Sequence, residues 1–180
     1  MLLRSTVLII PGLGNSGPEH WQSIWESRFN FTRIEQKEWE TPVCADWITN
    51  INNEVKKHDP ANVILVGHSL ACATIAWWAK EFNVTIKGAL LVSPSDTDAD
   101  SYPPGTKGFS PVPIIRLPFR SIAVVSNNDY YVMVERAKLF ADSWGSEFVN
   151  IGNAGHINAT SGFGEWDKGL ELLKQLDNLF

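Results

Sequence analysis

A serine, an aspartate and a histidine occur in this chain at places where their side chains could work together in acyl transfer. Ser69 lies within Gly67-His68-Ser69-Leu70-Ala71, Asp129 ends Ser126-Asn127-Asn128-Asp129, and His156 follows Gly155. A serine hydroxyl is a weak nucleophile until a base takes its proton, and the base needs an acid that fixes its tautomer. The three residue types therefore predict a nucleophile, its base and an orienting acid.

The segment around Ser69 predicts a strand, one sharp turn and a helix. Val63 to Val66 is a short apolar run rich in β-branched residues, which is typical of a parallel strand buried on both faces. A serine at the tip of such a strand forms a nucleophile elbow, a strained turn that needs small residues two positions before and after it. Gly67 meets this need, and Ala71 adds one methyl group where glycine is usual. A serine that only caps the helix is the alternative interpretation.

Asp129 and His156 follow the fifth and sixth predicted strands. Chemistry gathers at the carboxyl ends of the strands in open parallel sheets, so we expect both side chains near Ser69. The order serine, acid, histidine is that of α/β-hydrolases. Taken singly, Asp129 could cap a helix and His156 could be a solvated loop residue; taken together, they favour a triad with Ser69. Asp96 is the competing acid, but the two further aspartates close to it predict a solvated acidic loop.

Acyl transfer also needs hydrogen-bond donors for the oxygen that gains negative charge in the transition state. The predicted donors are the backbone N–H groups of Leu70, directly after the serine, and of Leu13, in the loop after the first strand. Three further residues are candidates for the substrate pocket, namely Asn15, His20 and His68. The turn is expected to point the His68 ring away from the serine hydroxyl.

The loop Gly12-Leu13-Gly14-Asn15-Ser16-Gly17 also matches the G-x-G-x-x-G pattern of dinucleotide-binding folds. Glu35 and Glu38 follow at about the distance of a ribose-binding acid. In that fold the third glycine lies in the first turn of a helix. Pro18 disfavours this arrangement, because the residue before a proline is biased away from helical conformation. We therefore expect all three glycines in a loop that shapes an oxyanion hole, and a nicotinamide or flavin oxidoreductase is the less favoured alternative.

Strands and helices alternate along the whole chain. Strands are predicted at residues 6–10, 31–36, 63–66, 86–92, 121–126 and 148–151, and helices at 18–29, 45–57, from the elbow to 80, 132–144 and 166–179. This alternation is typical of a parallel sheet with helices on both faces. We expect one compact α/β-hydrolase-like domain over residues 1–180, with about six mostly parallel strands.

Residues 93–118 differ in character from the rest of the chain. They hold six of the ten prolines and show little helical periodicity, so we expect a long loop over one end of the sheet. The segment is too short for an independent lid domain. Without a large lid, the acyl site is expected to be shallow and to favour short acyl chains.

Composition excludes few function classes but narrows the partners. With 180 residues, 44% hydrophobic and 19% charged, the chain has an ordinary globular composition, and its net charge of -5 argues against a nucleic-acid partner. Cys44 and Cys72 match no metal-ligand spacing and are expected to be free thiols. No stretch approaches the roughly 20 apolar residues of a membrane span, and no signal peptide is recognised. We expect a cytoplasmic protein that needs no metal or cofactor and does not bind a membrane.

Four blocks spread over nearly the whole chain carry a family resemblance. They are Pro11-Gly12-Leu13-Gly14-Asn15-Ser16 with His20-Trp21-Gln22, Gly67 to Ala71, Ser126 to Asp129, and Gly155-His156-Ile157-Asn158 with Ser161-Gly162 and Trp166. Together they resemble the small α/β-hydrolase-fold serine hydrolases typified by retinoblastoma-binding protein 9 and the bacterial YdeN-like proteins. The resemblance implies a compact fold that lacks the first two strands and the lid of larger members. It also implies Ser69 as nucleophile, His156 as base and Asp129 as its acid.

The family's name raises docking to retinoblastoma-type pocket proteins, which uses Leu-x-Cys-x-Glu. The nearest stretch here, Leu70-Ala71-Cys72-Ala73-Thr74, lacks the acid and lies in a predicted buried helix, so no such partner is expected. The expected function is hydrolysis of small acyl esters or related acyl compounds through an acyl-enzyme. A non-catalytic binding protein that retains the fold is the alternative from another class.

Overall fold

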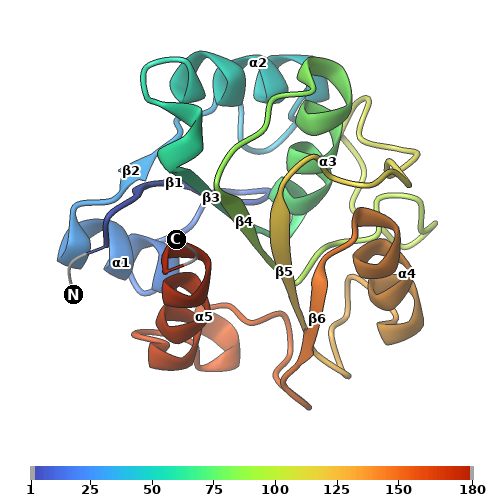
Figure 1. The fold of residues 1–180 in the computed structure, drawn as a ribbon. Coiled ribbons are helices and arrows are strands. Elements are labelled where there is room, and N and C mark those ends of the chain that lie inside the picture. The colour runs from blue at the N-terminus through green and yellow to red at the C-terminus, as the bar shows by residue number, and fades with distance from the viewer. Residues whose placement is uncertain (1–2, 179–180) are drawn as a thin grey trace.

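The structure is a computed structural model that describes residues 3–178. Six strands form one sheet in the order β2-β1-β3-β4-β5-β6, and every neighbouring pair is parallel (Figure 1). The strands are β1 Thr6–Ile10, β2 Thr32–Arg33, β3 Val63–His68, β4 Gly88–Val92, β5 Arg120–Val125 and β6 Glu147–Asn150. The predicted α/β fold with about six parallel strands is therefore confirmed.

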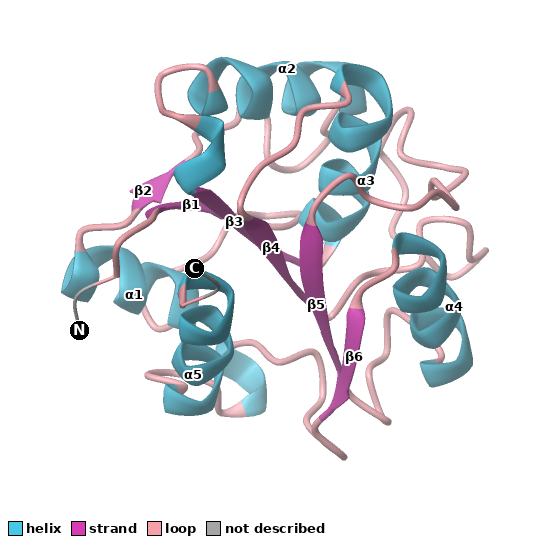
Figure 2. Ribbon diagram, viewed as in Figure 1, coloured by secondary structure: helices cyan, strands magenta, loops and turns pink. Residues whose placement is uncertain are grey.

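Helices cover both faces of this sheet (Figure 2). Within the described residues they are α1 Trp21–Phe29, α2 Cys44–Val55, α3 Leu70–Phe82, α4 Val134–Trp144 and α5 Asp167–Asp177, with two short 3-10 helices, η1 Pro60–Asn62 and η2 Ala159–Ser161. Helices α1 and α5 lie on one face, and α2, α3 and α4 lie on the other. Among residues 3–178, no helix is long and apolar enough to span a bilayer.

The central strands are buried on both faces because their side chains alternate between two cores. In β1, Val7 and Ile9 pack with Trp25 on the α1 and α5 side, whereas Leu8 and Ile10 pack on the side of α2 and α3. Successive side chains of a strand point to opposite faces, so a strand covered by helices on both sides needs an unbroken apolar run. The apolar runs of β1, β3 and β4 have this pattern.

The strand order places a crevice next to β1. Strand β2 pairs on one side of β1 and β3 pairs on the other, so the connections after β1 and β3 lead to opposite faces of the sheet. Where neighbouring connections lead to opposite faces, a crevice opens between them at the carboxyl ends of the strands, and ligands bind there in open α/β sheets. The loop after β1 and the turn after β3 therefore border the same crevice.

Two predicted boundaries near the start of the chain are wrong. The second strand spans only Thr32–Arg33 rather than residues 31–36, because it lies at the sheet edge and pairs with β1 at just two positions. The first helix begins at Trp21 rather than Pro18, because His20 is its N-cap and accepts a hydrogen bond from the Gln22 N–H.

The other predicted elements are present with ends shifted by at most two residues within the described part of the chain. Helix α5 begins at Asp167 and not at Trp166, whose positive φ of 40° is not helical. The predicted end of this helix, residue 179, lies outside the described residues.

Residues 93–118 are described throughout and contain neither helix nor strand, as predicted. The expectation that their aspartates form a solvated acidic loop is wrong for two of them. Arg136 of α4 donates from Nε to Asp96 Oδ2 at 3.0 Å and from Nη2 to Asp98 Oδ2 at 2.5 Å. These ion pairs are half-buried and anchor the start of the loop to α4.

Candidate active site

Ser69 joins the end of β3 to the start of α3 through a strained turn. Its backbone angles, φ 59° and ψ −122°, lie outside the regions that residues other than glycine ordinarily adopt. The Ser69 N–H donates to the carbonyl of Val92 at 2.9 Å, which fixes the turn against β4. A Cβ on Gly67 would lie 3.4 Å from Ala71 Cβ and 2.7 Å from Ile75 Cδ1, so the turn leaves little room. The backbone has the geometry of a nucleophile elbow.

Gly12, in the loop after β1, packs directly on this elbow. A Cβ at Gly12 would lie 2.8 Å from Ser69 Cβ and 2.9 Å from the His68 carbonyl oxygen, so no larger residue fits there without moving the turn. Residues 11–20 contain no helix, and all three glycines of the G-x-G-x-x-G match lie in the loop, as predicted. The motif therefore lacks the helix start that a dinucleotide site requires.

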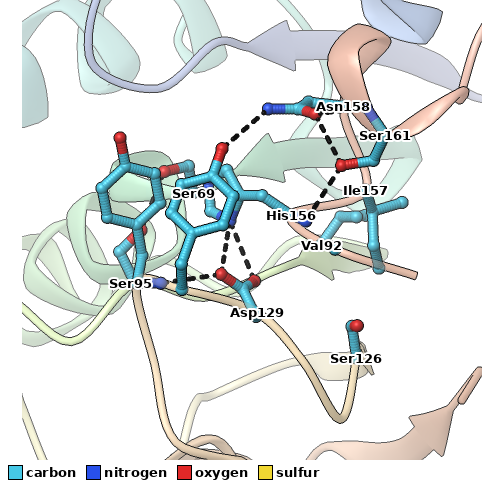
Figure 3. A network of polar contacts seen from close by, with 12 residues as sticks. Ser69, Val92, Ser95, Ser126, Asp129, His156, Ile157, Asn158 and Ser161 are labelled. Carbon is cyan, nitrogen blue, oxygen red and sulfur yellow. Dashed lines mark hydrogen bonds and ion pairs between the residues drawn. The ribbon is translucent and has the colours of Figure 1, made fainter. Parts of the chain in front are cut away.

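Asp129 holds the ring of His156, and both side chains are almost fully buried (Figure 3). The Nδ1 atom lies 2.9 Å from each carboxylate oxygen of Asp129. Because an ionised carboxylate only accepts hydrogen bonds, Nδ1 carries the proton and Nε2 is left as the acceptor of the neutral ring. Asp129 Oδ1 also accepts from the Tyr131 N–H at 2.9 Å, so the acid is itself oriented.

The backbone of His156 is fixed on both sides of the residue. Its N–H donates to Ser161 Oγ at 3.2 Å, and its carbonyl accepts from His68 Nε2 at 2.9 Å. Gly155 has a positive φ of 57°, and a Cβ there would overlap Ser161 Oγ. Glycine at this position lets the loop bring the ring against Asp129.

The loop that carries the acid is bonded to the loop that carries the base. Ser126 Oγ accepts from the Ala154 N–H at 2.9 Å, and Asn128 Oδ1 accepts from the Gly155 N–H at 2.8 Å. Ser126 Oγ also donates to Asn128 Oδ1 at 2.9 Å. These bonds explain why an aspartate after β5 and a histidine after β6 meet in one arrangement.

Ser95, which the sequence analysis did not identify, contacts the hydroxyl of Ser69. The two Oγ atoms are 2.8 Å apart, and Ser95 is buried. Within the described residues no hydrogen bond joins Ser69 Oγ to the ring of His156, so the hydroxyl is turned toward Ser95. Ser95 follows β4, so the rule that located Asp129 and His156, polar residues after strand ends, applies to it as well.

Three histidine rings lie in a row beside the elbow. The His68 ring centroid is 4.7 Å from that of His20 and 4.8 Å from that of His156. The ring of His68 therefore packs between the rings of His20 and His156, and its Nε2 is hydrogen-bonded to the His156 carbonyl. Burial lowers the pKa of His68 well below its ordinary value, and a positive charge on His156 or His20 would lower it further. His68 is neutral and serves as a support for the loop of His156.

A cavity of about 150 Å³ opens beside Ser69 and His156. All three predicted pocket residues line it, and so do all three tyrosines of the chain, which the sequence analysis did not include. The lining residues are Gly12, Leu13, Asn15, His20, His68, Ser69, Tyr102, Tyr130, Tyr131, His156 and Asn158. Tyr131 packs edge-on against His156 with 4.6 Å between ring centroids. The tyrosines were not identified because nothing in their local sequence marks them as facing the strand ends.

The two predicted oxyanion donors lie at this cavity and next to it. Leu13 lines the cavity, and Leu70 is the first residue of α3, where backbone N–H groups have no partner within the helix. No hydrogen bond joins either amide to another described residue outside the helices and strands. Both amides are free to donate.

Cys44 and Cys72 are free thiols, as predicted, and both are buried. Burial raises the pKa of Cys44 to about 12 and raises the pKa of Cys72 further. Cys72 Sγ contacts the carbonyls of Gly67 and Val92 behind the elbow. The thiols are therefore protonated and do not compete with Ser69 as nucleophiles.

A six-stranded parallel sheet with a serine at a strained strand-to-helix turn defines the α/β-hydrolase class, and its serine hydrolases in particular. The family model described as serine hydrolase matches residues 7–175, and the chain belongs to this family. No curated protein sequence matches the chain.

Solved structures show the same fold. A YdeN-like hydrolase from Pectobacterium atrosepticum is 34% identical over 97% of this chain and 91% of its own, with a TM-score of 0.85. The ydeN gene product of Bacillus subtilis is 19% identical over 96% and 98%, with a TM-score of 0.83. Est1E from Butyrivibrio proteoclasticus, solved with ferulic acid, is 15% identical over 96% and 89%, with a TM-score of 0.70. The resemblance to small α/β-hydrolase-fold serine hydrolases is thus confirmed.

Proposed function

We propose that this serine hydrolase cleaves small carboxylic esters or related acyl compounds through an acyl-enzyme on Ser69. The observation that carries the proposal is the Asp129–His156 pair, which leaves Nε2 of the ring as a proton acceptor at the cavity that Ser69 also lines. A hydroxyl and a basic nitrogen at one cavity are what nucleophilic acyl transfer needs. Est2 from Thermogutta terrifontis, a structural neighbour with a TM-score of 0.64, is an esterase solved with butyrate, which supports esters as the first substrates to test.

In the first step the Ser69 hydroxyl turns from Ser95 toward His156 and attacks the ester carbonyl carbon. His156 Nε2 takes the hydroxyl proton, and Asp129 stabilises the imidazolium that forms. When the tetrahedral intermediate collapses, the bond to the alcohol breaks and the alcohol oxygen leaves with the proton from Nε2. The acyl group remains on Ser69 Oγ.

In the second step water cleaves the acyl-enzyme. His156 Nε2 takes a proton from the water while its oxygen attacks the acyl carbon, and the Ser69 oxygen then leaves with that proton. In both steps the backbone N–H groups of Leu13 and Leu70 donate to the carbonyl oxygen as it becomes negative. A cavity of about 150 Å³ favours short acyl groups, so kcat/KM should be higher for a butanoate than for a decanoate ester of the same alcohol.

Labelling with a fluorophosphonate, followed by intact-mass measurement, tests the assignment. The wild-type protein should gain one adduct. Ser69→Ala and His156→Ala should not, because losing the nucleophile or the base of such a triad costs on the order of a millionfold in kcat. Ser95→Ala is the matched control, since it removes the other hydroxyl of a pair only 2.8 Å apart and should keep the adduct.

An adduct that persists in Ser69→Ala would contradict the assignment of the nucleophile. A folded wild-type protein that takes no adduct would favour the alternative of a binding protein that retains the fold. Esterase activity of Ser69→Ala equal to that of the wild type would reject the mechanism altogether.

A further inference from the structure

His20 has a buried hydrogen-bond donor without a partner beside the candidate active site. Its side chain is buried, with 6% of the residue exposed, and it lines the cavity that contains Ser69. Its Nδ1 accepts from the Gln22 N–H at 3.2 Å and so cannot carry a proton. The proton of the neutral ring is therefore on Nε2, which is buried and has no hydrogen-bond partner among the described residues.

The ring stays neutral because of its surroundings. Burial is the main reason that the pKa of His20 is lowered to about 4, and the positive charges of a protonated His156 and of Arg33 contribute to this lowering. A neutral ring with its proton on Nε2 can donate one hydrogen bond but cannot act as a base through that atom. His20 therefore does not duplicate His156. A buried donor without a partner is unfavourable, so a ligand that supplies an acceptor gains a hydrogen bond and removes this penalty.

The cavity offers this donor in an uncharged setting. Apart from the histidines, its polar lining consists of asparagine, serine and tyrosine side chains, and no lysine or arginine is among the described residues that line it. The nearby Arg33 is already engaged, because it pairs with Glu26 at 2.7 Å and donates to Asn15 Oδ1 and the Ser16 carbonyl. A carboxylate on the substrate would find no free counter-charge, whereas a neutral oxygen would find a donor.

We propose that His20 is a specificity-determining residue whose Nε2–H donates to an uncharged oxygen of the substrate. The substrate class is then small esters that carry a second, neutral oxygen, as an ether, hydroxyl or amide, in addition to the scissile ester. This inference rests on the proposed esterase function and adds the chemistry that the site selects.

Pairs of esters that differ only by an oxygen in place of a methylene test this proposal. A methoxyacetate is compared with a butanoate of the same phenol, and a 2-methoxyethyl ester with a butyl ester of the same acid. Each kcat/KM is divided by the rate of alkaline hydrolysis of the same ester, which removes intrinsic reactivity. For the wild-type protein, the ether member of at least one pair should be favoured about 3- to 10-fold, the range of one neutral hydrogen bond.

The variant His20→Phe keeps an aromatic ring beside His68 but removes the donor, so the ether preference should disappear. His20→Gln restores an N–H and should recover part of it. Damage to the fold lowers both members of a pair equally, so their ratio reports the hydrogen bond alone. His58→Phe, a histidine that does not line the cavity, is the control and should keep the wild-type ratio.

The proposal is overturned if the wild-type protein shows no ether preference in either pair, or if His20→Phe retains that preference. A third substrate, the succinate half-ester of the same phenol, carries a carboxylate in place of the neutral oxygen. If its kcat/KM, divided by its rate of alkaline hydrolysis, exceeded that of the methoxyacetate, the proposal would also be overturned. Fluorophosphonate labelling separates the two levels of inference. A labelled wild-type protein without ether preference rejects only the role of His20, whereas an unlabelled one rejects the esterase proposal on which that role rests.

Discussion

Asp129 and Asp96 both follow central parallel strands, and their surroundings decide which one can serve a histidine. Asp129 has both carboxylate oxygens 2.9 Å from His156 Nδ1. Asp96 pairs instead with Arg136 at 3.0 Å, on the side of α4. The guanidinium satisfies one carboxylate, and the imidazole satisfies the other. Asp129 therefore holds the ring of His156, whereas Asp96 anchors the long loop to α4.

Replacing Asp129 should impair the chemistry without changing the shape of the site. In Asp129→Asn the side chain can still contact Nδ1, but the neutral amide favours the wrong tautomer and does not stabilise an imidazolium. A fall in kcat of about 10⁴ is expected, as in the serine protease example of the same substitution. The measurement is steady-state hydrolysis of a short-chain ester.

Asp96→Asn is the matched control for this substitution. It removes a carboxylate at the end of the neighbouring strand, and kcat should stay within a few-fold of the wild type while thermal stability falls modestly. A large loss of kcat in Asp96→Asn with little loss in Asp129→Asn would reverse the assignment of the acid.

The sequence was sufficient to place Ser69, Asp129 and His156 at one edge of the sheet because each follows a predicted strand, and the strands before Ser69 and Asp129 are apolar and easily recognised. It was not sufficient for Ser95 or for the tyrosines at the cavity, since their roles depend on where a side chain points across the sheet edge. His20 was listed as a pocket residue, but its free Nε2 follows from one hydrogen bond to the Gln22 N–H. No spacing rule contains that information.

At the scale of elements, the loop after β1 and the turn after β3 fit together through Gly12. The side-chain amide of Gln22 in α1 reinforces this fit by donating to the carbonyl of Ile10 at the end of β1 and to that of Val66 within β3. The contact between the loop and the elbow thus depends on Gly12, which has no side chain, and on the side-chain amide of Gln22, which bridges the two strands.

Gly12→Ala should reduce activity strongly, because its Cβ would lie 2.8 Å from Ser69 Cβ and would displace the turn. Misplacement of reacting groups by about 1 Å can cost on the order of 100-fold, so kcat/KM should fall by about that factor. Ester hydrolysis and fluorophosphonate labelling rates measure the effect.

Gly17→Ala is the control within the same loop, since a Cβ there meets nothing within 4 Å. Its activity should match the wild type. Equal losses in the two variants would mean that the loop needs glycine for flexibility and not for close approach to the elbow.

Element prediction failed where pairing, not composition, sets the limits. The segment from residue 31 to 36 contains the strand-forming residues Phe31, Thr32 and Ile34, but only Thr32–Arg33 pairs, because the chain leaves the edge of the sheet. The start of α1 was predicted too early because proline is common at the first position of a helix. In the structure His20 caps the helix instead, so α1 begins at Trp21. Central strands and long helices contain enough apolar residues for their positions to be predicted from the sequence pattern.

Across the whole molecule, Asp177 at the end of α5 holds the start of β1. Its carboxylate accepts from the Arg4 and Ser5 N–H groups at 2.9 Å each and lies 3.5 Å from Lys87 Nζ. Burial alone would raise the pKa of Asp177, but the hydrogen bonds from Ser5 and Arg4 and the charge of Lys87 outweigh it and lower the pKa. This carboxylate joins residues that are far apart in the sequence.

Asp177→Asn should lower the free energy of unfolding by about 1.5–3 kcal/mol at pH 7, the range for hydrogen bonds to a charged group. Because the folded pKa lies below the unfolded one, the stabilisation is present above the unfolded value. It is lost as pH falls through the folded value. Urea unfolding of both proteins between pH 7 and pH 3 measures the difference, which should narrow at the acidic end.

Asp142→Asn serves as the comparison, since Asp142 pairs with Lys138 on an exposed surface of α4. Exposed pairs contribute about 0–1 kcal/mol, so this variant should unfold almost like the wild type. The role given to Asp177 would be contradicted if Asp177→Asn and the wild type had the same free energy of unfolding at pH 7. It would also be contradicted if the difference between them grew as the pH is lowered.

The backbone angles of Ser69 set the stability of the fold against the proposed catalytic role of this residue. Holding a non-glycine residue at φ 59° and ψ −122° costs on the order of 1–3 kcal/mol, which the hydrogen bond to Val92 and the packed strands on either side must offset. Native proteins have only about 5–15 kcal/mol of net stability, so this turn takes up an appreciable share. Glycine at position 69 would adopt these angles at lower cost but would lack the hydroxyl, so a serine nucleophile at this turn leaves the molecule less stable than its fold permits.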